Sequence, residues 1–335
     1  IDERVCDRLS RLGSVGPEAT VSAIQQDVVG INSNELYKSI SLQSAMKEMW
    51  DSRHGGARAR IRTGFKKLDT IIGSLVPGCT YLWAARTSHG KSSWLAEVVN
   101  NQALAGHRVG VIGLEDGYSV WASRYMSRTS GIKLNRIRDN ILSVCAENEH
   151  GRIAPLMDTE IDALEMSVKA PHLDNIHITD AKGARLVDVL RIMNELVLRF
   201  GCEIIWIDYL QAIYASGGDG RSRRDFLESA WAKMEHEATK LGVPLMITAQ
   251  LNREWEKDPL PSMPGLRHVE WMGAAEQKCY VGAIIYRPYK DTRLDPLQQH
   301  QRFNELLINV EKAKQGESKA LEFHFDPSAC LIREL

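Results

Sequence analysis

The sequence predicts an α/β fold with a mostly parallel sheet flanked by helices, and two observations support this prediction. After Thr63, short runs rich in β-branched and apolar residues alternate with longer stretches of helical periodicity. Such alternation is typical of parallel strands joined by crossover helices that cover both faces of one sheet. Near the end of the chain, two strand-like runs follow each other directly, which predicts an antiparallel pair at the sheet edge.

In chain order, the strand-like runs of the parallel part span residues 80–85, 108–114, 175–180, 203–208, 244–249 and 281–287. The clearest helical segments, 92–104 and 186–200, each lie between two of these runs. The antiparallel pair is expected at 305–314 and 319–326. Residues 63–335 are therefore expected to form one large domain.

A small helical linker is expected ahead of this domain. Residues 32–50 begin with an Asn that can cap a helix, continue with Glu35 three residues later, and place apolar side chains near one stripe. The Gly- and Arg-rich stretch after Trp50 is expected to be a hinge, so that linker and hinge together span 32–62. Residues 1–31 mix short helical patterns and are left unassigned, as an N-terminal helical remnant.

The composition is that of an ordinary globular chain without a global charge bias. Of the 335 residues, 42 are Lys or Arg and 43 are Asp or Glu, so the formal net charge is -1. Any DNA-binding surface must therefore be local. The six cysteines are far apart, which predicts reduced thiols, a cytoplasmic location and no zinc site. No apolar run approaches the about 18 residues of a membrane span, so no membrane partner is expected.

The stretch ARTSHGKSS, residues 85–93, predicts a phosphate-binding loop. It follows a strand-like run and opens a helical segment, where backbone N–H groups and the positive end of the helix dipole can hold the phosphates of ATP. Lys91 would reach the β- and γ-phosphates, and the Ser92 hydroxyl would ligate Mg²⁺. A plain strand–turn–helix with a surface lysine is the alternative. The candidate cofactor-binding residues are Arg86, Thr87, Ser88, His89, Gly90, Lys91, Ser92 and Ser93.

Three further strand ends carry polar side chains that suit ATP chemistry. Asp208 closes an apolar run at a point where a carboxylate can hold Mg²⁺. Glu115 is a candidate base for the attacking water, and Gln250 is a neutral amide able to sense the γ-phosphate. Each residue alone is more often simply a polar side chain that closes a strand. Four strand ends that converge on one phosphate loop are much less often coincidental, and they predict a site for ATP and Mg²⁺.

In this order the segments resemble the motor domain of the DnaB-like replicative helicases, which are RecA-type ring ATPases. The resemblance covers about residues 60–333 and accommodates Ala85 in place of the first glycine of the common loop pattern. It implies a RecA-like P-loop ATPase core, a catalytic Glu115, a Walker B Asp208, and a Gln250 that couples the γ-phosphate to a DNA-facing loop. The motifs that carry it are TGFKKLDTIIGSLVPG, AARTSHGKSS, VIGLEDGYSVWASRYMSRTSGI, IIWIDYLQAI, ITAQLNRE and GLRHVEWMGAAEQ.

The resemblance also implies DNA contacts on the channel side of the motor. Arg253 follows Gln250 in the ITAQLNRE motif, and Arg267 and Gly273 match the DNA-loop motif. Arg223 lies in a Gly-rich basic segment, which is either a solvated surface loop or a channel loop near phosphate. Contact with the phosphate backbone alone would need no aromatic strip for reading bases.

Two lysines fall where the resemblance places residues that act on the neighbouring subunit. Lys312 and Lys314 take the positions of a lysine and an arginine that reach the neighbour's γ-phosphate. Lysine is a point charge without the planar guanidinium fork, so a weaker or differently timed finger is expected from Lys314.

His89 and the tryptophans carry separate expectations. His89 is counted with the loop residues, but its ring is expected to face solvent, as such side chains more often do. Trp83, Trp94 and Trp206 occupy strand or helix positions and are expected to pack in the core.

Taken together, these patterns predict an ATP-dependent replicative DNA helicase. The resemblance implies a homo-hexameric ring that translocates 5′ to 3′ on single-stranded DNA and unwinds duplex, with primase and a helicase loader as further partners. It leans toward a divergent, phage-like member. Two alternatives stay open: a RecA-type recombinase that forms filaments, and a non-catalytic nucleotide-binding scaffold of a replication complex, which the Lys314 departure allows.

Overall fold

A computed structural model of the chain describes residues 41–44, 46–47, 60–138, 147–148, 151–152, 156–214, 222–270, 275–314 and 316–335. The chain divides after Arg58 into two compact units, and the second, Ala59–Leu335, carries the fold described below. The expected linker helix at 32–50 lies mostly outside the described residues, although 42–44 and 46–47 within it are helical. Residues 1–31 also lie outside them.

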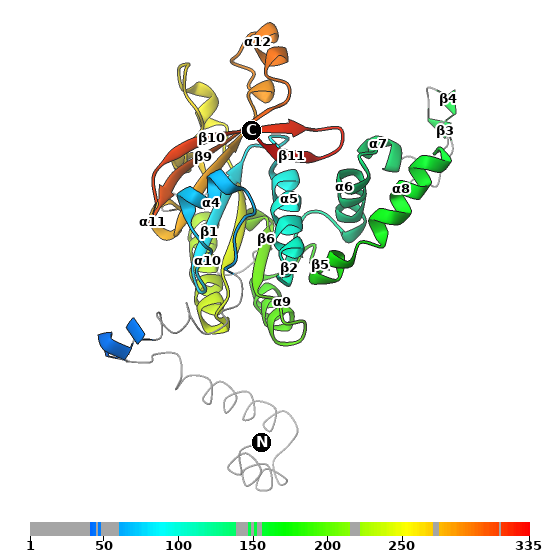
Figure 1. Ribbon diagram of the computed structural model, residues 1–335. Coiled ribbons are helices and arrows are strands. Elements are labelled where there is room, and N and C mark those ends of the chain that lie inside the picture. Colours follow the sequence, from blue (N-terminus) through cyan, green and yellow to red (C-terminus); the bar gives the residue numbers. More distant parts are fainter. Residues whose placement is uncertain are drawn as a thin grey trace. The chain divides into compact units, whose positions relative to one another are not determined.

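One sheet of nine strands organises this second unit, in the order β11-β10-β9-β8-β1-β7-β6-β2-β5 (Figure 1). The six strands from β8 to β5 in this order run parallel to one another. Each lies within one residue of a strand expected from the sequence, so these expectations are confirmed. The parallel strands are β1 (Thr80–Ala85), β2 (Val109–Gly113), β5 (Ile176–Asp180), β6 (Ile204–Asp208), β7 (Leu245–Gln250) and β8 (Val281–Tyr286).

The expected antiparallel pair is also confirmed, and the structure extends it by one strand. β9 (Glu305–Ala313) pairs antiparallel with β8, and β10 (Lys319–Asp326) pairs antiparallel with β9. β11 (Leu331–Glu334) forms the outer edge and was not expected from the sequence. Its four residues are too few for an alternation of buried and exposed side chains to stand out. A separate two-stranded sheet consists of β3 (Glu147–Asn148) and β4 (Gly151–Arg152).

Both faces of the sheet are buried under helices. Successive side chains of each strand point to opposite faces, so each strand contributes to two cores. In β1, Tyr81 and Trp83 point into one core, whereas Leu82 and Ala84 point into the other. The expected packing role of the tryptophans is confirmed, since Trp83, Trp94 and Trp206 are all fully buried. The covering helices are α4 (Lys66–Ile72) and α5 (Lys91–Leu104) on the first face, and α9 (Leu186–Leu198) and α10 (Arg223–Leu241) on the second.

Among the described residues, three further α-helices lie between β2 and β5 in the chain. α6 (Tyr118–Ser130), α7 (Leu134–Ile137) and α8 (Asp158–Val168) share a small core of their own, and α8 lies on the far side of α6 from the sheet (Figure 1). The short elements are η3 (Pro171–Asn175), η4 (Leu210–Ala212), η5 (Glu254–Lys257), η6 (Leu266–His268), α11 (Ala275–Lys278), η7 (Pro288–Lys290) and α12 (Pro296–Gln301).

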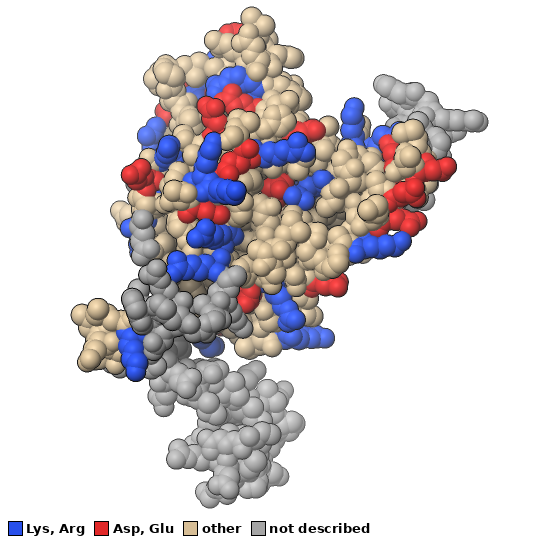
Figure 2. Space-filling view, viewed as in Figure 1, with Lys and Arg blue, Asp and Glu red and all other residues tan. Residues whose placement is uncertain are grey.

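The surface charges agree with the near-zero formal charge of the chain. On the face shown in Figure 2, Lys and Arg are intermixed with Asp and Glu. Within the part of the chain that the structure describes, no helix is both long and apolar enough to cross a membrane. The same described residues contain no group of three or more His, Cys, Asp or Glu side chains arranged to hold a metal ion.

Candidate active site

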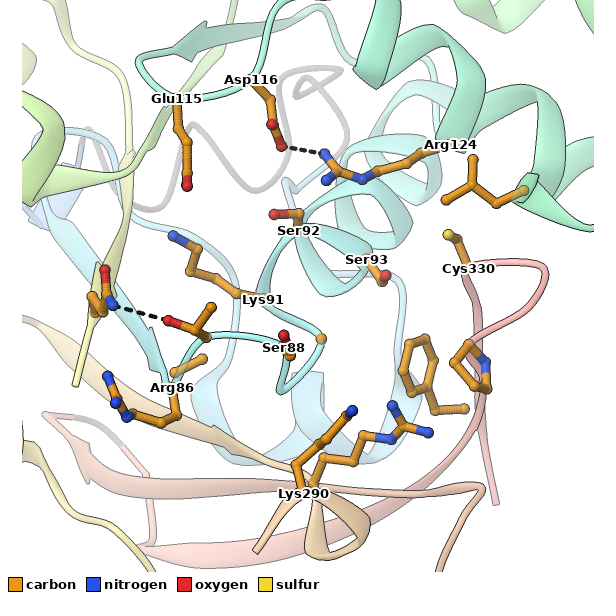
Figure 3. A pocket seen from close by; sticks show the side chains of 18 residues that line it. Arg86, Ser88, Lys91, Ser92, Ser93, Glu115, Asp116, Arg124, Lys290 and Cys330 are labelled. Atoms are coloured by element: carbon orange, nitrogen blue, oxygen red, sulfur yellow. Dashed lines mark hydrogen bonds and ion pairs between the residues drawn. The ribbon is translucent and has the colours of Figure 1, made fainter. Parts of the chain in front are cut away.

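A pocket of about 400 Å³ lies at the carboxyl edge of the parallel strands, around the loop that joins β1 to α5 (Figure 3). A volume in this range suits a small-molecule ligand. Lys91 and Glu115 extend into it from α5 and from the end of β2, and Ser92 lies between them and Ser93 (Figure 3). Gln250 lines it from the end of β7. The structure therefore brings these sequence-predicted residues together at one place.

The loop between β1 and α5 bends tightly because two of its residues have left-handed backbone conformations. Ser88 has a φ of 66° and Gly90 a φ of 93°. Gly90 directly precedes α5, and any side chain there would be strained by the backbone and would touch Leu306 at 3.4 Å. The first N–H groups of α5 have no partner within the helix and carry the positive end of its dipole. The start of α5 is thus suited to an anion such as a phosphate.

Lys91 and Asp208 form an ion pair at the base of the pocket. The Lys91 ammonium lies 3.3 Å from Asp208 Oδ1 and 3.8 Å from the centre of the Tyr209 ring. Asp208 is only 2% exposed, and the Thr248 hydroxyl donates a hydrogen bond of 2.6 Å to the same oxygen. The carboxyl group is therefore fixed in position beside the lysine that the sequence predicted to bind phosphate.

Glu115 stands just beyond the end of β2, and its side chain extends into the pocket toward Lys91 (Figure 3). Loss of hydration in the pocket raises the pKa of its carboxyl group. Lys91 opposes this rise in pKa, while the negative charges of Asp116 and Asp208 add to it. A carboxylate with a raised pKa is a better proton acceptor, so the position and the electrostatics of Glu115 both suit a general base.

Gln250 connects the phosphate loop with the following segment of the chain. Its side-chain Nε2 donates a hydrogen bond of 2.9 Å to Thr87 Oγ1 in the loop. Its backbone N–H donates to Gln211 Oε1 at 3.0 Å, and Gln211 Nε2 donates in turn to the carbonyls of Gln250 and Glu270. A ligand that displaces Thr87 would therefore break or shift the hydrogen bond of Gln250 at the end of β7.

The structure adds pocket residues that sequence reasoning missed. Arg124 on α6 lines the pocket and donates to Asp116 Oδ2 at 2.5 Å (Figure 3). Arg287 and Lys290 enter from the end of β8 and from η7, and Cys330 enters from the turn before β11. β8 is a parallel strand next to β1, so its carboxyl end lies at the same edge as the phosphate loop. This position is the sequence signal from which Arg287 could have been predicted to line the pocket. Nothing in the sequence indicated that the turn before β11 returns to the loop.

One expectation about the phosphate loop is wrong. The His89 ring does not face solvent: the residue is 2% exposed, and Nδ1 accepts the backbone N–H of Arg287 at 3.2 Å. The ring does not line the pocket either, in contrast to its neighbours Ser88 and Gly90. Burial lowers the pKa of His89 to about 4, so the ring is neutral near pH 7. The tight loop turns this side chain inward.

The candidate DNA-binding residues have different surroundings. Arg253 is exposed, and the exposed Arg267 donates to Asp258 Oδ2 at 2.8 Å. Arg223 is half-buried, and its guanidinium donates to the carbonyls of Gln211 and Ile213. These hydrogen bonds tie the start of α10 to the backbone at η4. Gly273 lies outside the described residues.

Lys312 and Lys314 lie far from the pocket of their own chain. Lys312 pairs with Gly282 near the start of β8, and its ammonium donates to the Gln277 carbonyl. The Lys314 ammonium lies 5.7 Å from the centre of the Tyr280 ring. Both lysines are therefore at the amino edge of the parallel strands, opposite the phosphate loop.

Comparison with known proteins gives this arrangement a family. The model of the DnaB-like helicase C terminal domain matches residues 60–333. This chain belongs to the DnaB-like helicase family. Because that match covers most of the chain, the resemblance of the ordered motifs is confirmed.

Two curated relatives illustrate the range of the match within the DnaB-like family. The replicative DNA helicase DnaB of Leifsonia xyli is 28% identical over 292 residues, which cover 84% of this chain and 57% of that protein. The replicative DNA helicase DnaC of Bacillus subtilis is 26% identical over 251 residues, which cover 74% of this chain and 51% of that protein. The chain thus spans about half the length of the curated relatives it matches.

Solved structures share the fold of the DnaB-like motor. One of them, an ATPase domain solved by itself, has a TM-score of 0.73 at 20% identity, and the match covers 89% of this chain and 100% of that domain. A DnaB-like replicative helicase, described together with its interactions with primase, has a TM-score of 0.72 at 19% identity. That match covers 95% of this chain and 76% of the helicase chain. The expected RecA-like α/β core is confirmed.

Proposed function

We propose that this chain is the motor of an ATP-dependent replicative DNA helicase. The observation that carries the proposal is that the ends of three parallel strands bring Glu115, Asp208 and Gln250 to one phosphate loop. Membership of the DnaB-like family supports it. The proposal concerns the whole assembly in which the chain acts, since the chain spans about half of its curated relatives.

ATP would bind with its phosphates over the start of α5. Lys91 would leave its contact with Asp208 and turn to the β- and γ-phosphates, to which backbone N–H groups of the loop also donate. The residues present fit Mg²⁺: the Ser92 hydroxyl lines the pocket, and the buried Asp208 carboxylate is held in place by Thr248. When bound there, Mg²⁺ supplies positive charge that neutralises the phosphate oxygens.

Hydrolysis would begin with a water molecule placed beside Glu115. The Glu115 carboxylate would accept the proton of that water as it attacks the γ-phosphate, since its raised pKa favours proton acceptance. Gln250 would report the loss of the γ-phosphate through its hydrogen bond to Thr87. Arg253, shortly after Gln250, and Arg267 in η6 would hold single-stranded DNA by its phosphates. Arg223 and Gly273 are further candidates.

A homo-hexameric ring would complete the site. Lys312 and Lys314 are at the opposite edge of the sheet from the loop of their own chain, so that a neighbouring copy would have to supply them. The family implies translocation 5′ to 3′ on single-stranded DNA. Primase and a helicase loader are candidate partners in the cytoplasm, in line with the described DnaB-like helicase that interacts with primase. The linker at 32–62 and the motor at 63–335 remain our proposed domains.

The test is ATP hydrolysis with and without single-stranded DNA. We expect DNA to stimulate the wild-type protein, and both Lys91→Ala and Glu115→Gln to lose at least about 100-fold in kcat. Glu115→Gln should still bind ATP, because Glu115 is not expected to hold the phosphates. Lys169→Ala is the matched control, since Lys169 is exposed and pairs with Glu165 on α8, away from the pocket.

Other outcomes would favour the alternatives. ATP binding without any hydrolysis would indicate a nucleotide-binding scaffold. Hydrolysis by open filaments in electron micrographs, without unwinding of a tailed duplex, would indicate a recombinase-type ATPase. Closed rings that unwind the duplex are the outcome expected of a helicase.

A further inference from the structure

Arg293 forms hydrogen bonds with several residues of the chain between the end of β7 and η6. We call residues 251–268 the sensor-to-DNA segment, because it joins Leu251, next to Gln250, to Arg267. The Arg293 guanidinium donates to the backbone carbonyls of Trp255, Asp258 and Ser262 and to the Ser262 hydroxyl, at 2.8 to 3.1 Å. One side chain from outside the segment thus holds three of its residues.

Arg293 is itself held by a buried acid. Asp291 is 0% exposed and accepts from Arg293 Nε and Nη2 at 2.9 and 2.7 Å, in a two-pronged ion pair. The Tyr286 hydroxyl donates to Asp291 Oδ2 at 2.6 Å. Burial by itself raises the pKa of Asp291, but the hydrogen bonds from Arg293 and Tyr286 outweigh it, and the net pKa is lowered. The acid is therefore charged, and the guanidinium plane is fixed.

The same arginine reaches the phosphate loop through aromatic rings. Its guanidinium carbon lies 4.3 Å from the centre of the Trp255 ring, a cation–π contact. The centre of the His89 ring lies 6.1 Å from that of Trp255, edge to face, and 5.8 Å from that of Tyr286. His89 also accepts the Arg287 N–H, which joins the loop to the end of β8. Packed side chains thus run without a gap from the loop to Arg293.

At its far end the network meets a candidate DNA-binding residue. Asp258, whose carbonyl accepts from Arg293, uses its carboxylate to accept from Arg267 at 2.8 Å. The His268 ring lies 3.5 Å from the same carboxylate. A shift of the sensor-to-DNA segment would therefore move Arg267 and Trp255 together, because both are tied to the backbone that Arg293 holds.

We propose that Arg293 is a positioning residue that couples DNA binding at the sensor-to-DNA segment to the phosphate loop, by way of Trp255 and His89. This inference rests on the proposed helicase function. Gln250 already connects the end of β7 to the phosphate loop through Thr87. Arg293 would add a second connection to the loop through His89, on the side of β8. Arg293 touches neither ATP nor the reacting water in this scheme, since it does not line the pocket.

A purely structural role would give a different signature. If Arg293 only stabilised the fold, its substitution would lower hydrolysis with and without DNA in the same proportion. A coupling role changes the ratio of the two rates instead. The ratio of DNA-stimulated to DNA-independent kcat is therefore the readout, together with KM for ATP and the thermal midpoint of unfolding.

The main variant is Arg293→Lys, with Arg302→Lys as its matched control. Lysine keeps the charge beside Asp291 but cannot reproduce the six hydrogen bonds of the guanidinium. Arg302 makes the same kind of two-pronged pair, with Glu305 at the start of β9, outside the sensor-to-DNA segment. Trp255→Phe is the second variant, because it weakens the cation–π contact and leaves the Arg293–Asp291 pair intact.

With oligo-dT as the DNA, we expect Arg293→Lys to lower the stimulation ratio by about 3- to 10-fold. Its DNA-independent kcat and its KM for ATP should stay within about 2-fold of wild type, Trp255→Phe should show a smaller loss, and Arg302→Lys should match wild type. An unchanged ratio in a folded Arg293→Lys protein overturns the inference and leaves the helicase proposal standing. If Arg293→Lys does not fold, an unchanged ratio in Trp255→Phe overturns it. Wild-type hydrolysis that DNA does not stimulate overturns both proposals.

Discussion

The two ends of the parallel strands differ sharply in what they offer to a nucleotide. At the carboxyl edge, Lys91, Glu115 and Gln250 surround one pocket. At the amino edge, Lys314 donates its N–H to the Tyr280 carbonyl, and Tyr280 donates to Thr80 at the start of β1. The length of β1 separates the two edges by about 16 Å. One chain therefore holds the phosphate loop and the candidate lysine finger too far apart to meet.

Because of this separation, a site that uses the lysines would have to be divided between copies. We expect the carboxyl edge to bind a nucleotide by itself, because its loop, carboxylates and amide all come from one chain. The lysines can contribute only if a second copy places its amino edge against the pocket.

Asp208→Asn should have the largest effect. Asparagine keeps the size of the side chain and can still accept from Thr248, but it removes the charge beside Lys91 and the anionic Mg²⁺ ligand. We expect a loss of about 100- to 1000-fold in kcat, measured as phosphate release at saturating ATP. The thermal midpoint of unfolding is the control for folding. A kcat near that of wild type would show that ATP hydrolysis does not need the Asp208 carboxylate.

Lys314→Ala should lose about 10- to 100-fold in ATP hydrolysis, less than an arginine finger would cost. Mixing Lys314→Ala with Lys91→Ala tests the division directly. Each mixed interface that joins an intact loop from one chain to an intact Lys314 from the other should recover activity. Activity that stays at the sum of the two separate variants would contradict a site shared between copies.

The pH dependence of hydrolysis sharpens the assignment at the carboxyl edge. Because the pKa of Glu115 is raised above its ordinary 4.5, the base gains its proton at a higher pH than an exposed glutamate. The rate should therefore fall as the pH drops through this raised value, by about tenfold per pH unit below it. Stopped-flow phosphate release over a pH series measures this limb. A limb centred at 4.5 or lower would count against Glu115 as the base.

Lys312→Ala should have the smallest effect, about 2- to 3-fold in ATP hydrolysis. Its ammonium already donates to the Gln277 carbonyl, so the side chain has a structural task at the amino edge. The same phosphate-release assay, run beside Lys314→Ala, measures the difference between the two lysines. If Lys312→Ala proved as damaging as Lys314→Ala, both lysines would have to act on the neighbouring pocket.

The sequence determined the parts of this protein that depend on local order along the chain. Strand-like runs with apolar side chains fixed the parallel strands, because a strand buried on both faces needs them. The polar residues that follow those runs, Glu115, Asp208 and Gln250, were predicted to meet since parallel strands end at one edge. The phosphate loop was recognisable because its consecutive glycine, lysine and serine follow a strand-like run and open a helical segment.

Which distant residues join this site depends on the tertiary structure. Arg287 and Cys330 reach the pocket because β8 lies beside β1 and the chain turns back at β11, and neither pairing is written in local periodicity. His89 is buried because the loop closes over the end of β8, and Arg293 holds a segment about thirty residues or more before it in the chain. Strand order and backbone geometry set these contacts, and burial then fixed what each side chain can do.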